Sequence, residues 1–405
     1  MAAARGLLAS KALITLALVI FAGLALVSGL DRQAKVDARW ASRIPDFFAD
    51  EALRVRGAAL LAQGKAVDAK QLGMLAVANS PLDPQSPALL GAGRLASGDR
   101  AGAEQAFRIA GQMGWRVPLT QAYWMGQALT VGDYRVAALR LDALLRQQPG
   151  LLGQQQLLDP MERNPAGRAA MIERLALRPP WLRNYTHDVA TVPAQAMLQR
   201  TDVLTELAQG LGPLGCEMIQ PSTDRLAELG LITEGRSLWR AHCPKVGLGL
   251  LGDPGLAMID LNNGAGAYGW SVYGDSELQI TVSPGKGGHG NSLSVSGNAG
   301  FARIFLAQLL VLTPGNYTLS WRAVDDAGQP SARTLASLGC RGDPPHWQTA
   351  VLDSASKRWR LTVNAAPACR GYVVAFGANE QPGAFSIDQV KLEPVGATGT
   401  VQPGR

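Results

Sequence analysis

Aromatic side chains that stand beside charged groups are the residues of this sequence with the clearest chemistry. Sugars present apolar C–H faces, which stack on aromatic rings, and hydroxyl groups, which hydrogen-bond to charged and amide side chains. Tyr273 and Asp275 follow a Gly269-Trp270 dipeptide, and a Pro344-Pro345 bend stands before an aromatic pair. The residues whose types and positions suit such contacts are Tyr273, Asp275, Arg322, His346 and Trp347.

Catalytic motifs are missing from the sequence. Glycoside hydrolysis needs two carboxyl groups held across a bond, but acids such as Asp325, Asp326 and Asp343 stand in turn-like segments, where acidic residues are common. Neither a G-x-S-x-G nor an H-E-x-x-H pattern occurs. We therefore expect no enzymatic activity, and an enzyme of a new kind is the alternative.

Charge and composition exclude further classes of protein. The chain has 405 residues, of which 47% are hydrophobic and 17% charged, so it can form packed cores and is long enough for two or three domains. Its 38 basic and 32 acidic residues give a net charge of +6, which is spread thinly along the chain. No basic stripe could neutralise a run of phosphates, so we expect no nucleic-acid partner.

The amino terminus predicts a membrane anchor. Residues 12–30 carry no charge, Arg5 and Lys11 precede them, and charges of both signs follow. About twenty apolar residues suffice for a helix to cross a bilayer. We expect residues 1–31 to be an uncleaved anchor in a bacterial inner membrane, crossed once, with the bulk of the chain in the periplasm. A signal peptide cleaved near the small residues at 27–29 is the rival interpretation.

All four cysteines lie in the second half of the chain, without C-x-x-C spacing. This pattern favours disulfides in an oxidising compartment over a metal site. Three pairings are possible, and we favour Cys216 with Cys243 and Cys340 with Cys369, because each pair falls inside one expected structural unit. Each bond would add about 3 kcal/mol in the chain-entropy account. Reduced, buried thiols are the alternative.

A repeat of 34 residues organises the first half. The pairs that mark it are Gly64-Lys65, Gly98-Asp99 and Gly132-Asp133, and Ala69, Ala103 and Ala137 follow in phase. These residues resemble the tetratricopeptide repeat, a helix-turn-helix unit with small residues at the helix crossing and a glycine at the turn. The resemblance implies an α-helical repeat domain over 46–245, clear over 46–149 and degenerate over 150–245. Such stacks hold partner proteins, although a mere spacer is the alternative.

The distal half predicts an all-β sandwich. Ten short alternating runs separated by Gly, Pro and Asn are expected to be strands. They cover 268–274, 277–283, 291–297, 302–312, 316–324, 332–340, 347–353, 357–363, 371–377 and 385–392. Alternation sends Trp321 and Trp359 to one face and Arg322 to the other, so Trp270, Trp321 and Trp359 are expected in the core.

The order of these runs over 256–393 resembles the jelly-roll carbohydrate-binding modules and their galactose-binding-like relatives. The residues that carry the likeness are Gly269-Trp270 and the segments 291–297, 314–321 and 385–392. The resemblance implies a glycan or polysaccharide ligand and a structural calcium ion, for which Asp260 and Asp388 could supply oxygens. No other cofactor is expected. Residues 394–405 are expected to be a flexible tail.

The sequence thus predicts a multidomain α plus β protein: a transmembrane helix, a helical solenoid and a jelly-roll sandwich. The function it favours is a membrane-anchored periplasmic adaptor, whose repeats dock a partner protein and whose sandwich binds glycan during assembly or export of a cell-surface polysaccharide. A protein-binding envelope-assembly scaffold with a sandwich that binds no sugar is the alternative, and an accessory subunit of a hydrolase is a third.

Overall fold

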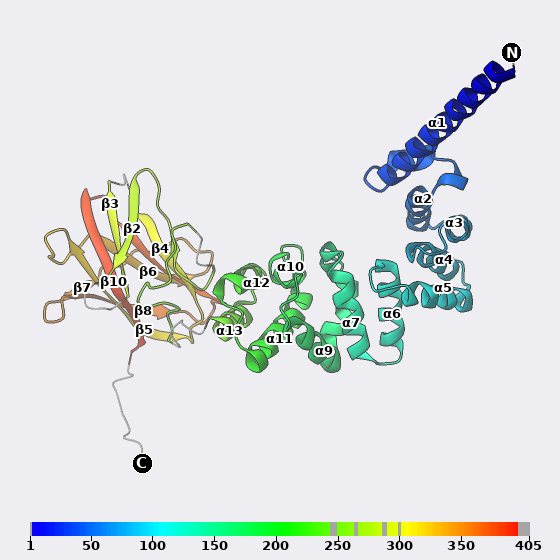
Figure 1. Ribbon diagram of the computed structural model, residues 1–405. Helices are drawn as coiled ribbons and strands as arrows, with labels where there is room; N and C mark the ends of the chain where they lie inside the picture. The colour runs from blue at the N-terminus through cyan, green and yellow to red at the C-terminus, as the bar shows by residue number, and fades with distance from the viewer. Residues whose placement is uncertain (1, 244–248, 263–265, 286–289, 299–300, 396–405) are drawn as a thin grey trace. The chain divides into compact units, whose positions relative to one another are not determined.

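In a computed structural model of the chain (Figure 1), helices occupy the amino-terminal half and an antiparallel β-sandwich follows. The structure describes residues 2–243, 249–262, 266–285, 290–298 and 301–395. The chain forms two compact units, Met1–Leu151 and Leu152–Arg405. The predicted tail lies outside the described residues from position 396 onward. The predicted fold class is confirmed.

The first unit begins with the long helix α1, Ala2–Ala34. Its segment Leu13–Ala34 has a mean hydropathy of 2.6 and is not buried, and among the described residues it is the one helix long and apolar enough to span a membrane. Two short 3₁₀ segments follow, η1 at Ala38–Arg43 and η2 at Asp46–Phe48.

The 34-residue period appears as three helix pairs. They are α2 Glu51–Ala62 with α3 Ala66–Asn79, α4 Gln85–Ala96 with α5 Arg100–Gln112, and α6 Pro118–Thr130 with α7 Tyr134–Leu145. The three turn glycines, Gly64, Gly98 and Gly132, have φ values of 75°, 87° and 74°, which residues with a Cβ rarely adopt. Ala69, Ala103 and Ala137 are wholly buried, as close helix packing requires. The pairing of helices is as predicted, and membership of the tetratricopeptide family stays a resemblance.

Six further helices belong to the same compact unit as the sandwich. They are α8 Gln155–Arg163, α9 Pro165–Leu175, α10 Leu182–His187, α11 Ala194–Leu211, α12 Cys216–Glu228 and α13 Ile232–His242. A buried polar cluster joins three of them: Tyr185 donates a hydrogen bond to Glu162 at 2.7 Å, and Arg200 lies 3.3 Å from the same carboxylate oxygen. Buried charges are stable only when paired in this way.

The sandwich consists of two antiparallel sheets. Its strands are β1 Ser271–Val272, β2 Leu278–Pro284, β3 Asn291–Gly297, β4 Arg303–Leu310, β5 Gly315–Asp325, β6 Thr334–Cys340, β7 Val351–Asp353, β8 Arg358–Ala365, β9 Tyr372–Ala378 and β10 Gly383–Pro394. One sheet has the order β1-β4-β9-β6, and the other has the order β2-β3-β10-β5-β8-β7. Every predicted run overlaps one of these strands.

Aromatic side chains fill the space between the sheets. Trp270 and Trp321 are 2% and 0% exposed, and both rings pack beside Phe376, with centroids 6.1 and 5.2 Å away. Trp359 packs against the same core and is half-buried. The prediction that these tryptophans point inward is confirmed, because strand alternation fixes the side of the sheet.

Both favoured disulfides are present. Cys216–Cys243 joins the start of α12 to the residue after α13, with Cα atoms 5.0 Å apart. Cys340–Cys369 joins the end of β6 to the loop before β9, with Cα atoms 5.2 Å apart. Among the described residues no cysteine is free. The first bond therefore closes the helix pair that lies beside the sandwich.

Candidate functional site

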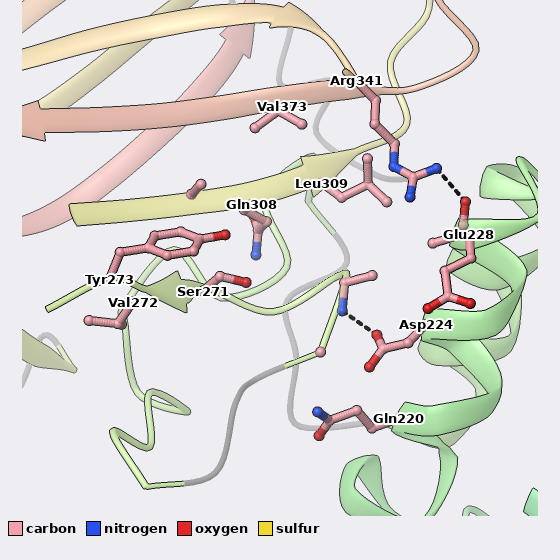
Figure 2. A pocket seen from close by; sticks show the side chains of 14 residues that line it. Gln220, Asp224, Glu228, Ser271, Val272, Tyr273, Gln308, Leu309, Arg341 and Val373 are labelled. Carbon is pink, nitrogen blue, oxygen red and sulfur yellow. Dashed lines mark hydrogen bonds between the residues drawn. The ribbon is translucent and has the colours of Figure 1, made fainter. Parts of the chain in front are cut away.

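A hollow of about 510 Å³ lies where α12 meets the four-stranded sheet (Figure 2). The helix contributes polar side chains, and the sheet contributes an apolar floor with a tyrosine beside it. The residues whose side chains define it are Gln220, Asp224, Glu228, Ser271, Tyr273, Leu309, Arg341 and Val373. Its volume falls within the range of about 300–1,000 Å³ that small-ligand sites occupy.

Helix α12 is attached to the sandwich on two sides of this hollow. The Asp224 carboxylate accepts a hydrogen bond from the backbone N–H of Ala267 at 2.6 Å. The Arg341 guanidinium donates to the backbone carbonyl of Ala227, near the carboxyl end of the helix. That carbonyl end carries partial negative charge, which favours a cation there. Figure 2 shows these two bridges at different levels of α12.

Asp224 has an environment unlike that of an exposed acid. Burial against the sandwich raises its pKa above the usual 3.8, although the hydrogen bond from Ala267 acts in the opposite direction. Glu228, one turn further along, is largely exposed and forms an ion pair with Arg225 at 3.2 Å. The hollow therefore offers a half-buried oxygen acceptor rather than a strong net charge.

Tyr273 stands at the edge of the hollow on the outer face of the four-stranded sheet. In β1, Ser271 and Val272 pair with Ala307 and Leu306 of β4. Alternation turns Val272 toward the core and Tyr273 outward, and 53% of Tyr273 is exposed. The Tyr273 backbone N–H donates to the Phe305 carbonyl at 3.0 Å, which fixes the main chain at this position beside β4.

Trp347 lies on the same outer face. A Cβ atom at Gly377 in β9 would come within 2.6 Å of the Trp347 ring, so the indole covers this glycine. Because β1 and β9 both neighbour β4, they are two strand spacings apart, or about 10 Å. His346 precedes it in the chain, and the His346 N–H donates to Ser337 of β6 at 3.0 Å. The structure thus brings Tyr273, His346 and Trp347 to one sheet face.

Asp275 supports the segment that follows Tyr273. Its carboxylate accepts backbone hydrogen bonds from Glu277 and Leu278 at 2.8 and 2.9 Å and pairs with Arg303 at 2.7 Å. The backbone bonds, with Arg303 adding attraction, hold the pKa of this carboxyl below its ordinary value. The geometry gives Asp275 a role in fixing the loop, and direct contact with a sugar stays a prediction.

Arg322 lies on the opposite side of the sandwich from Tyr273. It projects from β5 on the outer face of the six-stranded sheet and pairs with Asp388 of β10 through both carboxylate oxygens.

The same ion pair affects the predicted calcium site, because a calcium ion at Asp388 would have to displace the Arg322 guanidinium. Asp260 accepts a backbone hydrogen bond from Asn262. In the described part of the chain, no group of three or more acidic, His or Cys residues could hold a metal, and the calcium site stays a prediction.

Sequence reasoning missed the residues that α12 contributes. Asp224 meets a residue 43 positions away, and Arg341 meets one 114 positions away. A signal was present, since Gln220, Asp224 and Glu228 recur every four residues and so share one helix face. Nothing local indicates what that face contacts.

No family model matches the sequence. No curated protein matches it either. Among solved structures, the chain is similar to TmCBM61 in complex with β-1,4-galactotriose, with 14% identity over 36% of this chain and 99% of that one and a TM-score of 0.24. It is also similar to the CBM22-1 xylan-binding domain of Paenibacillus barcinonensis Xyn10C, with 13% identity over 36% and 93% and a TM-score of 0.25.

A third similar structure is the enzymatically active domain of tailspike protein 4 of bacteriophage CBA120, with 15% identity and a TM-score of 0.23. The match covers 31% of this chain and only 19% of the tailspike. At such identities and scores, what these proteins bind or cleave does not transfer to this chain. The assignment of a two-sheet sandwich rests on its own strands.

Proposed function

We propose that the protein binds glycan on the outer face of its four-stranded sheet. The observation that carries the proposal is an exposed ring, Tyr273, beside a hollow with an apolar floor and a polar wall. The floor is formed by Ala307, Leu309 and Val373, and the wall by Gln220 and Asp224. An apolar surface with an aromatic ring and adjacent hydrogen-bonding groups is what a sugar ring requires.

We expect substitution of Tyr273 to weaken this binding. Tyr273→Ala removes an exposed ring without opening the core, and loss of a central aromatic contact costs about 2 kcal/mol, or roughly thirtyfold in affinity. The measurement is retardation of the full-length protein, in detergent, in native gels cast with xylan, β-1,4-galactan, cellulose derivative, β-1,3-glucan or dextran. Arg360→Ala, an exposed change on the six-stranded sheet, is the control.

Absence of retardation by every polymer, together with absence of binding to short oligosaccharides of each, would contradict the proposal. Equal retardation of wild type and Tyr273→Ala would show that the glycan does not bind to this face of the four-stranded sheet.

We also propose that α1 remains attached as a membrane anchor. Asp31 is 6% exposed and accepts backbone hydrogen bonds from Asp50, Glu51 and Ala52. It therefore caps the first turn of α2, whose N–H groups have no partner within that helix. The α1 residues Val27 and Leu30 pack in the hydrophobic cluster that contains Ala52 and Leu53.

Cleavage at 27–29 would cut through this continuous helix and weaken the support of the first repeat. We expect the intact mass of protein extracted from membranes to be that of the uncleaved chain. A mature chain beginning near residue 28 or 30 would contradict retention of the anchor.

The anchor and the glycan face suit a protein that holds a surface polysaccharide close to a membrane. On this proposal the bulk of the chain lies in the periplasm, which the disulfides favour. The three helix pairs of the first unit would then dock a partner protein of the polysaccharide machinery, as stacked helix pairs do in general.

A further inference from the structure

The wall that α12 forms limits how a polysaccharide could lie on the four-stranded sheet. The sheet floor of the hollow, Leu309 and Val373, ends against the side chains of Gln220, Asp224 and Glu228 (Figure 2). A chain following the strands would meet the helix. The helical part of this unit is therefore a component of the candidate site.

Further contacts beside the hollow hold α12 and α13 against the sandwich. A Cβ atom at Gly266 would approach the Gln220 side chain within 2.7 Å, and one at Gly371 would approach Ile232 of α13 within 3.2 Å. The buried Tyr268 hydroxyl donates to the Ile232 carbonyl at 2.7 Å. These contacts pack Gln220 of α12 and Ile232 of α13 directly against the sandwich beside the hollow.

The sides of the hollow are bridged too. The hydrogen bond from Arg341 to the Ala227 carbonyl joins the sandwich to α12 near the carboxyl end of the helix. The hydrogen bond from the Ala267 N–H to Asp224 joins them about one turn earlier. Between the two bridges the hollow opens toward the exposed ring of Tyr273. In the described part of the chain, the hollow is bounded by α12 on one side and is open beside Tyr273.

We propose that the hollow receives the end of a glycan chain and not its interior. This inference rests on the proposed glycan binding. The terminal sugar would lie on Leu309 and Val373 with its hydroxyl groups toward Asp224 and Gln220, and the next sugar would stack on Tyr273. The hydrogen-bonding groups that line the wall suit a neutral sugar, since the charge of Glu228 is balanced by Arg225.

The stoichiometry on chains of different length tests this. The probes are the five gel polymers and oligosaccharides of two to eight residues prepared from each of them. Titration calorimetry with the full-length protein in detergent gives the affinity per chain and the number of proteins per chain. If the chain end binds, the affinity per chain and the number of proteins per chain should stay constant once the oligosaccharide is long enough to fill the hollow and reach Tyr273. One protein should then bind each long chain.

A number of bound proteins that rises with chain length would overturn the inference while leaving glycan binding intact. Failure of the protein to bind any of the five polymers or the oligosaccharides prepared from them would contradict the proposed function itself, and the inference would fall with it. The two failures are therefore distinguishable.

A matched pair of variants locates the site independently. Ser271→Trp places an indole in the hollow, and Ser283→Trp places one on the exposed side of β2 in the other sheet. We expect at least a tenfold loss of affinity for the retained oligosaccharide in the first variant and none in the second. Near-ultraviolet circular dichroism checks that both fold, and undiminished affinity in a folded Ser271→Trp variant would contradict the assignment.

Discussion

The two outer faces of the sandwich follow the same strand alternation but carry different side chains. On the six-stranded sheet, the arginine side chains have partners within the sandwich: Arg322 pairs with Asp388, Arg360 pairs with Asp353 at 2.8 Å, and Arg358 donates to Gln389. On the four-stranded sheet, small residues and an exposed tyrosine stand beside a hollow. A face whose polar groups are already paired contributes stability, whereas a face with an exposed ring and acceptors beside it can contribute recognition.

The largest effect is expected from breaking the pair on the six-stranded sheet. Asp388 is 5% exposed, so Arg322→Leu would leave a buried carboxylate without its cation. Removing one member of such a pair costs about 3 kcal/mol, and we expect the urea midpoint of the sandwich, followed by tryptophan fluorescence, to fall accordingly. Retardation by the glycan gel should not change.

The matched control is Arg360→Leu, which breaks an exposed ion pair and should cost less than about 1 kcal/mol. Equal destabilisation by the two substitutions would show that burial of Asp388 contributes little. Loss of glycan retention in Arg322→Leu would indicate that the glycan binds to the six-stranded face.

A smaller effect should come from acid. Because burial raises the pKa of Asp224, this carboxyl takes up a proton at a higher pH than an exposed aspartate does as the solution is acidified. Its protonated form loses one acceptor for a sugar hydroxyl, so we expect affinity for the retained oligosaccharide to fall a few-fold between pH 7 and pH 4. Asp275, whose pKa is lowered, stays ionised over most of this range.

The check is calorimetry at several pH values on the wild type and on Asp224→Asn, which cannot titrate. A flat profile in the variant is the expected result. An identical acid loss in both proteins would assign the effect to another group.

Much of the architecture was predictable because local patterns determine it. Turn glycines at a fixed period give the helix pairs, and alternation around Trp321 gives both the strand and its buried side. Tyr273 and Trp347 could also be singled out as candidates, since an aromatic residue at a strand end or after a Pro-Pro bend is visible without tertiary knowledge. The disulfides followed from the boundaries of the expected units.

The rest depended on contacts between distant segments. Alternation shows that Arg322 points away from the core, but only the strand order shows that this is the face opposite Tyr273. The bulge between Asp388 and Lys391, where Gln389 has a φ of 52°, has no glycine to mark it. The face of α12 that closes the hollow resembles any polar helix surface until its partner is known.

Amide hydrogen exchange of the full-length protein, with and without a glycan that binds it, shows directly whether the ligand lies on the four-stranded sheet. We expect slower exchange in α12 and in the segments 266–274 and 303–309, and unchanged exchange in β5, β7 and β8. Protection confined to 318–324 and 351–362 would contradict it, because the glycan would then lie on the six-stranded sheet.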